Sequence, residues 1–116
     1  MARYDHLSVY QNAYDLNLYF FKLSRGFPKD FKYGLAGEVK SLLSELLDQI
    51  VIANNVTDKV IVLKKATLSI ERIKVKGRML HDLKVMSLKS YEYFFARLVE
   101  ISKQLAKWHA WAKKAP

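Results

Sequence analysis

Residues 63–80 read LKKATLSIERIKVKGRML, and small or apolar residues recur in this stretch at alternating spacings of three and four. This spacing places them along one face of an α-helix. Sustained over several turns, it is typical of a helix that packs along its length against neighbouring helices. The pattern therefore predicts a helix over about residues 58–84 with one buried seam. The seam consists of Leu63, Ala66, Ile70, Ile73, Gly77 and Leu80.

The same periodicity predicts three more helices, over about residues 7–25, 35–55 and 88–111. The predicted seam of the first helix is Leu7, Tyr10, Tyr14, Leu18 and Phe21, with Val9, Ala13, Leu16, Phe20 and Leu23 beside it. The seam of the second is Leu35, Val39, Leu42, Leu46, Gln49 and Ala53. The seam of the last is Tyr91, Phe94, Leu98, Ile101, Leu105 and Trp108. Four helices of this length with short connections predict an all-α fold, an antiparallel up-down-up-down four-helix bundle. Residues 1–116 are expected to form one domain.

Glycine interrupts this pattern at two places, once inside a predicted helix and once between two helices. Gly77 lies inside the third predicted helix, where glycine costs roughly 1 kcal/mol relative to alanine. It indicates either the close approach of a neighbouring helix or a local kink. The stretch FPKDFKYGL, residues 27–35, places Pro28 and Gly34 between the first two helices. We interpret it as a connection between helices.

Composition limits the cellular setting. The 116 residues include no cysteine, and 51% of them are hydrophobic. The absence of cysteine excludes disulfides and thiolate metal sites, and with no apolar signal segment it favours a cytoplasmic location. The longest apolar runs, such as LYFF and VIVL, are far shorter than the roughly 20 residues that span a bilayer, so no membrane segment is expected.

Charge is unevenly distributed along the chain. Twenty Lys/Arg residues and 11 Asp/Glu residues give a net charge of +9. Residues 1–58 hold six basic and seven acidic residues, a net of −1, whereas residues 59–116 hold fourteen and four, a net of +10. An excess confined to one half of a domain indicates a basic surface for a polyanion, although it could also serve solubility alone.

The sequence carries no recognisable catalytic or cofactor-binding constellation. No Glu-x-x-His pair supports a di-metal carboxylate bundle, and no Gly-x-x-x-x-Gly-Lys loop supports nucleotide binding. The three histidines lie far apart, without carboxylates at metal-ligand spacing. We therefore expect a protein that is not an enzyme and that has no catalytic residues, no metal and no cofactor.

The candidate binding residues are cations on the last two predicted helices. Lys65, Arg72 and Lys76 lie seven and four residues apart and so face one direction. Phosphate contacts by such a surface would bind RNA or DNA in a salt-sensitive manner with little sequence selectivity. The alternative is that these side chains only solvate the outer face of the bundle. The candidate set is Lys64, Lys65, Arg72, Lys74, Lys76, Arg78, Lys103 and Lys107.

Aromatic residues fall into two groups. Those on the predicted seams are expected in the core rather than stacked on bases. Four others lie off the seams and are candidates for a subunit or partner interface, because aromatic residues are enriched in interface cores. These four are Tyr19, Tyr93, Phe95 and Trp111.

The order of these features resembles a bacterial four-helix-bundle family that includes proteins encoded in ribosomal RNA intervening sequences. Residues 14–55 read YDLNLYFFKLSRGFPKDFKYGLAGEVKSLLSELLDQIVIANN, with Phe27-Pro28 ending the first helix and Tyr33-Gly34-Leu35 opening the second. The ribosomal branch continues with an Asn-Ile-Ala-Glu-Gly signature at the end of its second helix. This chain lacks that signature and departs from the branch.

Two other stretches, LLSELLDQIVIANNVTDKVIVLKKA (residues 42–66) and LVEISKQLAKWHAW (residues 98–111), look more like the accessory variability determinant proteins of diversity-generating retroelements. The resemblance implies a protomer of a basic homopentamer. It also implies a non-catalytic accessory role: binding nucleic acid and associating with a reverse transcriptase during mutagenic copying of template RNA (mutagenic retrohoming).

Three alternatives remain open from the sequence. The chain could be a bundle of the ribosomal intervening-sequence type, or a protein-protein interaction bundle without direct nucleic-acid binding. Basic amphipathic helices can also attach to anionic lipid surfaces.

Overall fold

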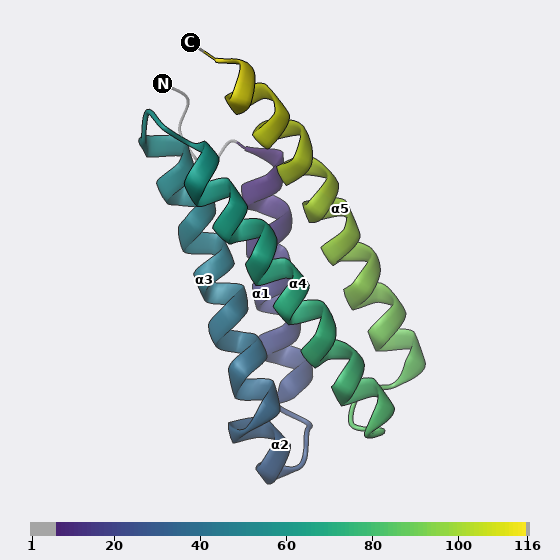
Figure 1. The fold of residues 1–116 in the computed structure, drawn as a ribbon. Helices are drawn as coiled ribbons and strands as arrows, with labels where there is room; N and C mark the ends of the chain where they lie inside the picture. The colour runs from purple at the N-terminus through teal and green to yellow at the C-terminus, as the bar shows by residue number, and fades with distance from the viewer. Residues whose placement is uncertain (1–6, 116) are drawn as a thin grey trace.

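The computed structural model describes residues 7–115, which form five α-helices and no strand (Figure 1). The helices are α1 Ser8–Ser24, α2 Lys29–Tyr33, α3 Leu35–Asn55, α4 Val60–Asp82 and α5 Leu88–Lys114. The four long helices correspond to the four predicted ones, and the all-α prediction is confirmed. The short α2 lies within the predicted connection, so this corner contains a helical turn.

The four long helices surround one core. α3 packs against α1 and α4, and α5 packs against α4 and α1, so each helix has two neighbours. Figure 1 shows consecutive long helices running in opposite directions, with the start of α1 and the end of α5 at the same end of the bundle. The described chain measures 49 × 20 × 20 Å, an elongated shape set by the length of its helices.

The predicted seam of α4 is fully buried. Leu63, Ala66, Ile70, Ile73 and Leu80 each have 0% exposure, and Gly77 is also buried. In α3, Leu35 is half-buried and the rest of the predicted seam is buried. The buried Gln49 of this seam accepts a hydrogen bond at Oε1 from Ser69 Oγ, at 3.0 Å. In α5, the four central seam residues are buried, and Tyr91 and Trp108 are half-buried.

The predicted seam of α1 is wrong at three positions. Tyr14, Leu18 and Phe21 are 41–51% exposed, whereas the core receives the flanking residues Val9, Ala13, Leu16 and Phe20. The cause is that α1 carries two adjacent apolar stripes, and helical spacing alone cannot say which one meets α3 and α5.

Asn17 marks the buried face of α1. Its Nδ2 donates to Ala13 O at 2.9 Å and to Leu43 O at 3.0 Å, so the side chain joins α1 to α3. Buried amides are retained where such hydrogen bonds satisfy them. This polar anchor breaks the apolar pattern from which the seam was predicted.

Gly77 is a site of close helix approach. A Cβ atom at this position would lie 3.2 Å from Cε2 of Phe94, which projects from α5. α4 continues without interruption from Val60 to Asp82. Of the two interpretations of Gly77, the structure supports close packing, because the missing side chain makes room for the Phe94 ring.

Gly34 holds the corner between α2 and α3, and replacing it with alanine is expected to destabilise the fold by about 1–3 kcal/mol. A Cβ atom there would lie 2.7 Å from the backbone oxygen of Asp30, which can move only if α2 moves. Urea denaturation measures the effect. Gly37→Ala is the matched control, because its Cβ would meet Lys32 O at an ordinary 3.7 Å and alanine favours a helix by up to about 1 kcal/mol. Equal effects of the two changes would contradict this account.

Candidate nucleic-acid interface

The positive charge of the protein is concentrated on α4 and α5. Each of these helices holds six Lys/Arg and two Asp/Glu residues, a net charge of +4. α1 holds one residue of each sign, and α3 holds one basic and three acidic residues, a net of −2. Because α4 and α5 are adjacent, one side of the bundle is cationic and the side of α3 is not.

An apolar line divides the cations of α4 into two rows. Ile61, Leu68, Val75 and Met79 follow one another at spacings of seven, seven and four along the outer face and are 46–62% exposed. We call this line the α4 ridge. The six candidate cations of α4 therefore lie in two rows, with Lys65, Arg72 and Lys76 on one side of the ridge and Lys64, Lys74 and Arg78 on the other.

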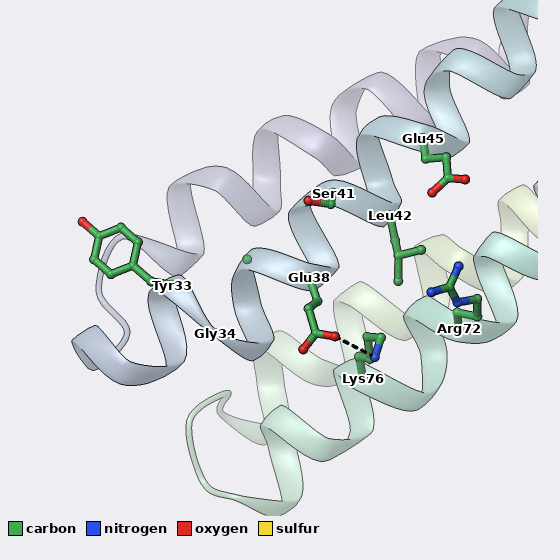
Figure 2. Close-up of a pocket in the computed structure, with 9 residues that line it drawn as sticks. Tyr33, Gly34, Glu38, Ser41, Leu42, Glu45, Arg72 and Lys76 are labelled. Atoms are coloured by element: carbon green, nitrogen blue, oxygen red, sulfur yellow. Dashed lines mark hydrogen bonds and ion pairs between the residues drawn. The ribbon is translucent and has the colours of Figure 1, made fainter.

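The first row faces α3 and its carboxylates. Lys76 Nζ lies 3.3 Å from Glu38 Oε1. Figure 2 shows this contact, with Glu45 and Arg72 lining the same recess from opposite helices. Lys65 lines a second recess further along the same groove, with Glu45, Asp48 and Asp58. Lys76 is thus paired within the protein, and the carboxylates near Lys65 and Arg72 lower the positive potential there. Both effects weaken the attraction of this row for phosphate.

The second row faces α5. Lys74 lies over the Phe95 ring, with Nζ 5.8 Å from its centroid, and Arg78 follows one turn later. Helical spacing places Lys64 on the same side, earlier in α4. Lys74 contacts Glu71 at 3.2 Å and Arg78 contacts Asp82 at 3.5 Å, both on the helix surface. Such surface pairs are worth roughly 0–1 kcal/mol, so phosphate can compete for these cations.

Lys103 and Lys107 lie exposed on the outer face of α5, and within residues 7–115 neither forms an ion pair. The helix continues to Lys114. Because Lys114 follows Lys107 by seven residues, the three lysines share one face. Lys114 was not among the predicted candidates because the predicted helix ended at about residue 111, although its seven-residue spacing from Lys107 is visible in the sequence. We call Lys103, Lys107 and Lys114 the α5 row.

The four aromatic interface candidates lie in three separate places. Tyr19 and Tyr93 contact each other between α1 and α5, with ring centroids 4.7 Å apart, and Arg97 lies over Tyr93. Phe95 lies toward α4, and Trp111 is 59% exposed near the end of α5. They do not form one patch. The larger exposed apolar surfaces are the α4 ridge and the outer stripe of α1, neither of which the sequence analysis had assigned to the surface.

The described residues also bear on metal binding and on membrane insertion. Within residues 7–115, no cluster of three or more His, Asp or Glu side chains could hold a metal ion. No helix in this part of the chain combines the length and hydropathy needed to cross a bilayer.

Comparison with known proteins adds one match. A family model described as bAvd-like matches residues 7–113, nearly the whole chain. A search of curated proteins finds no match. The family match confirms the resemblance to accessory variability determinant proteins, which had rested on residues 42–66 and 98–111. The chain belongs to the bAvd-like family.

Proposed function

We propose that this protein is a non-catalytic, nucleic-acid-binding accessory protein of a diversity-generating retroelement. It acts in the cytoplasm as a homo-oligomer and associates with a reverse transcriptase to support mutagenic copying of template RNA. Family membership supports the accessory role. The observation that carries nucleic-acid binding is the pairing of two adjacent helices with net charges of +4 each, beside an acidic α3.

Phosphate contact explains how such a surface works. Lysine and arginine side chains that neutralise phosphates release bound counterions, and this release drives association without reading bases. The protein would hold template RNA or its DNA copy without strong sequence preference, which suits an accessory factor whose partner enzyme performs the chemistry.

The two groups of cations are expected to contribute unequally. The α5 row, with Lys64, Lys74 and Arg78, faces away from α3 and forms the principal phosphate surface. Lys65, Arg72 and Lys76 contribute less, because Glu38, Glu45 and Asp48 lie opposite them.

Two variants that remove the same charge test this proposal. One changes the α5 row, Lys103, Lys107 and Lys114, to alanine, and the other changes Lys65, Arg72 and Lys76 to alanine. Fluorescence anisotropy measures the affinity of each for labelled structured RNA and duplex DNA across a salt series. We expect the α5-row variant to lose about tenfold or more in affinity and about one unit of salt slope per lost contact. The other variant should lose clearly less.

Several outcomes would contradict the proposal. Absence of binding by the wild-type protein even at low salt would remove the nucleic-acid function. Equal losses in the two variants would show that only net charge matters and would remove the division into rows. Circular dichroism establishes that both variants are folded. Co-purification with a reverse transcriptase encoded beside this chain tests the second partner, and failure to co-purify would contradict that part of the proposal.

A further inference from the structure

Two aromatic rings lie among the lysines on the solvent-facing side of α5. The residues along this side follow one another at spacings of three or four, and all of them are exposed. We call them the α5 outer line, which contains the α5 row. The α5 outer line consists of Lys89, Tyr93, Ala96, Glu100, Lys103, Lys107, Trp111 and Lys114.

Trp111 lies inside the α5 row. It follows Lys107 by four residues and precedes Lys114 by three, so its Cβ is roughly 5–6 Å from the Cβ of each lysine. Its side chain is 59% exposed. One exposed ring alone would say little, since single apolar residues are common on protein surfaces. The informative fact is its position, because a nucleotide whose phosphate contacts either lysine brings its base within reach of the indole.

Tyr93 offers a second ring nearer the start of α5. Tyr19 of α1 packs against it, with ring centroids 4.7 Å apart, and the Tyr93 side chain is still 50% exposed. Arg97 lies over the ring, with Cζ 5.8 Å from the centroid. Aromatic rings and guanidinium planes both stack on bases. This part of the helix therefore presents two flat groups, with Lys89 one turn earlier for a phosphate.

The rings distinguish unpaired from paired nucleic acid, which phosphate contacts alone do not. In a duplex the faces of the bases are stacked on one another, whereas in a single strand they are free to stack on a side chain. We propose that the α5 outer line binds single-stranded nucleic acid, with bases stacked on Trp111 and Tyr93 and phosphates held by the α5 row. This inference rests on the proposed function and specifies the form of nucleic acid that the protein prefers.

The distance between the rings sets the length of strand that can reach both. Tyr93 and Trp111 are eighteen residues apart, roughly 27 Å of helix. At the 3.4 Å spacing of stacked nucleotides this distance corresponds to about eight nucleotides. Single-strand-binding folds have site sizes of roughly 4–16 nucleotides, so one helix face of this length is sufficient.

The test replaces the ring of Trp111 without changing the charge. Trp111→Leu keeps an apolar side chain but removes the flat face, whereas Trp111→Phe keeps a ring. Fluorescence anisotropy measures binding to a labelled single-stranded RNA of about twelve nucleotides and to the duplex of the same sequence. We expect Trp111→Leu to weaken single-strand binding about fivefold or more, Trp111→Phe to weaken it less, and both to leave duplex affinity within about twofold. The salt slope should not change, because no phosphate contact is lost.

A matched control and a second readout accompany this comparison. Tyr33→Leu removes a ring that is 73% exposed on α2, away from α5, and should leave both affinities unchanged. The chain has two tryptophans, so in a Trp108→Phe background the fluorescence comes from Trp111 alone. Single-stranded RNA should quench this fluorescence by stacking on the indole, and duplex should quench it clearly less. Circular dichroism establishes that each variant is folded.

Other results would overturn the inference. An unchanged single-strand affinity in Trp111→Leu, or equal losses for single strand and duplex, would exclude base stacking at this position. A Trp111→Leu variant that keeps its RNA affinity but no longer co-purifies with the reverse transcriptase would assign the ring to a protein interface instead. Failure of the wild type to bind either form would remove the nucleic-acid function itself. Binding of both forms without any effect of Trp111→Leu would remove this inference alone.

Discussion

Replacing Phe94 with alanine is expected to lower the free energy of unfolding by about 3–5 kcal/mol. Phe94 projects from α5 and is 1% exposed. Its ring lies 5.3 Å from the Phe20 ring of α1, between centroids, and fills the space beside Gly77 of α4. One side chain thus joins three of the four long helices. Its removal leaves a cavity that rigid helices can close only in part.

Urea denaturation followed by circular dichroism measures this loss, at a fixed protein concentration because assembly would contribute to stability. Phe95→Ala is the neighbouring control. Phe95 is 37% exposed, so the same truncation should cost roughly 1 kcal/mol or less. If the two substitutions destabilise the protein equally, the central position assigned to Phe94 is wrong.

Replacing Gly77 with leucine is expected to lower the free energy of unfolding by about 3 kcal/mol, because it overfills the core where Phe94→Ala would leave a cavity. Even a single Cβ atom would lie 3.2 Å from the Phe94 ring, and the rest of a leucine side chain would have no space between α4 and α5. Overpacked cores force side chains off their rotamers or separate helices. The measurement is the same denaturation experiment.

A double-mutant cycle separates crowding from a general effect on helix formation. In the Phe94→Ala background, the leucine at position 77 would enter the space left by the ring, so the double variant should be more stable than the sum of the two single effects predicts. Strict additivity would show that the two positions do not share one space. Room for the Phe94 ring would then no longer account for glycine at position 77.

The candidate interface illustrates where sequence reasoning stops. Spacing placed Lys65, Arg72 and Lys76 on one side of their helix, and all three line recesses between α3 and α4. It could not show that Glu38, Glu45 and Asp48 of a different helix lie opposite them. Helical periodicity describes one helix at a time, whereas the potential at a surface is the sum over all neighbouring helices.

The buried face of α1 was predicted wrongly for the same reason, because periodicity describes one helix without its neighbours. The two apolar stripes on this helix were equally acceptable from spacing, and the prediction chose the one with Tyr14, Leu18 and Phe21. Packing buried the other stripe, where Asn17 reaches the backbone of α3. A seam that contains one polar residue is easily missed, because the partner that satisfies it lies 26 residues away.

Local patterning in the sequence determined the four long helices, their approximate bounds and the cationic character of the second half of the chain. These properties depend on residues within a few turns of one another. Tertiary structure alone decided which stripe of α1 is buried and which cations of α4 face carboxylates. These depend on how helices distant in sequence are placed side by side, which periodicity within a single helix does not encode.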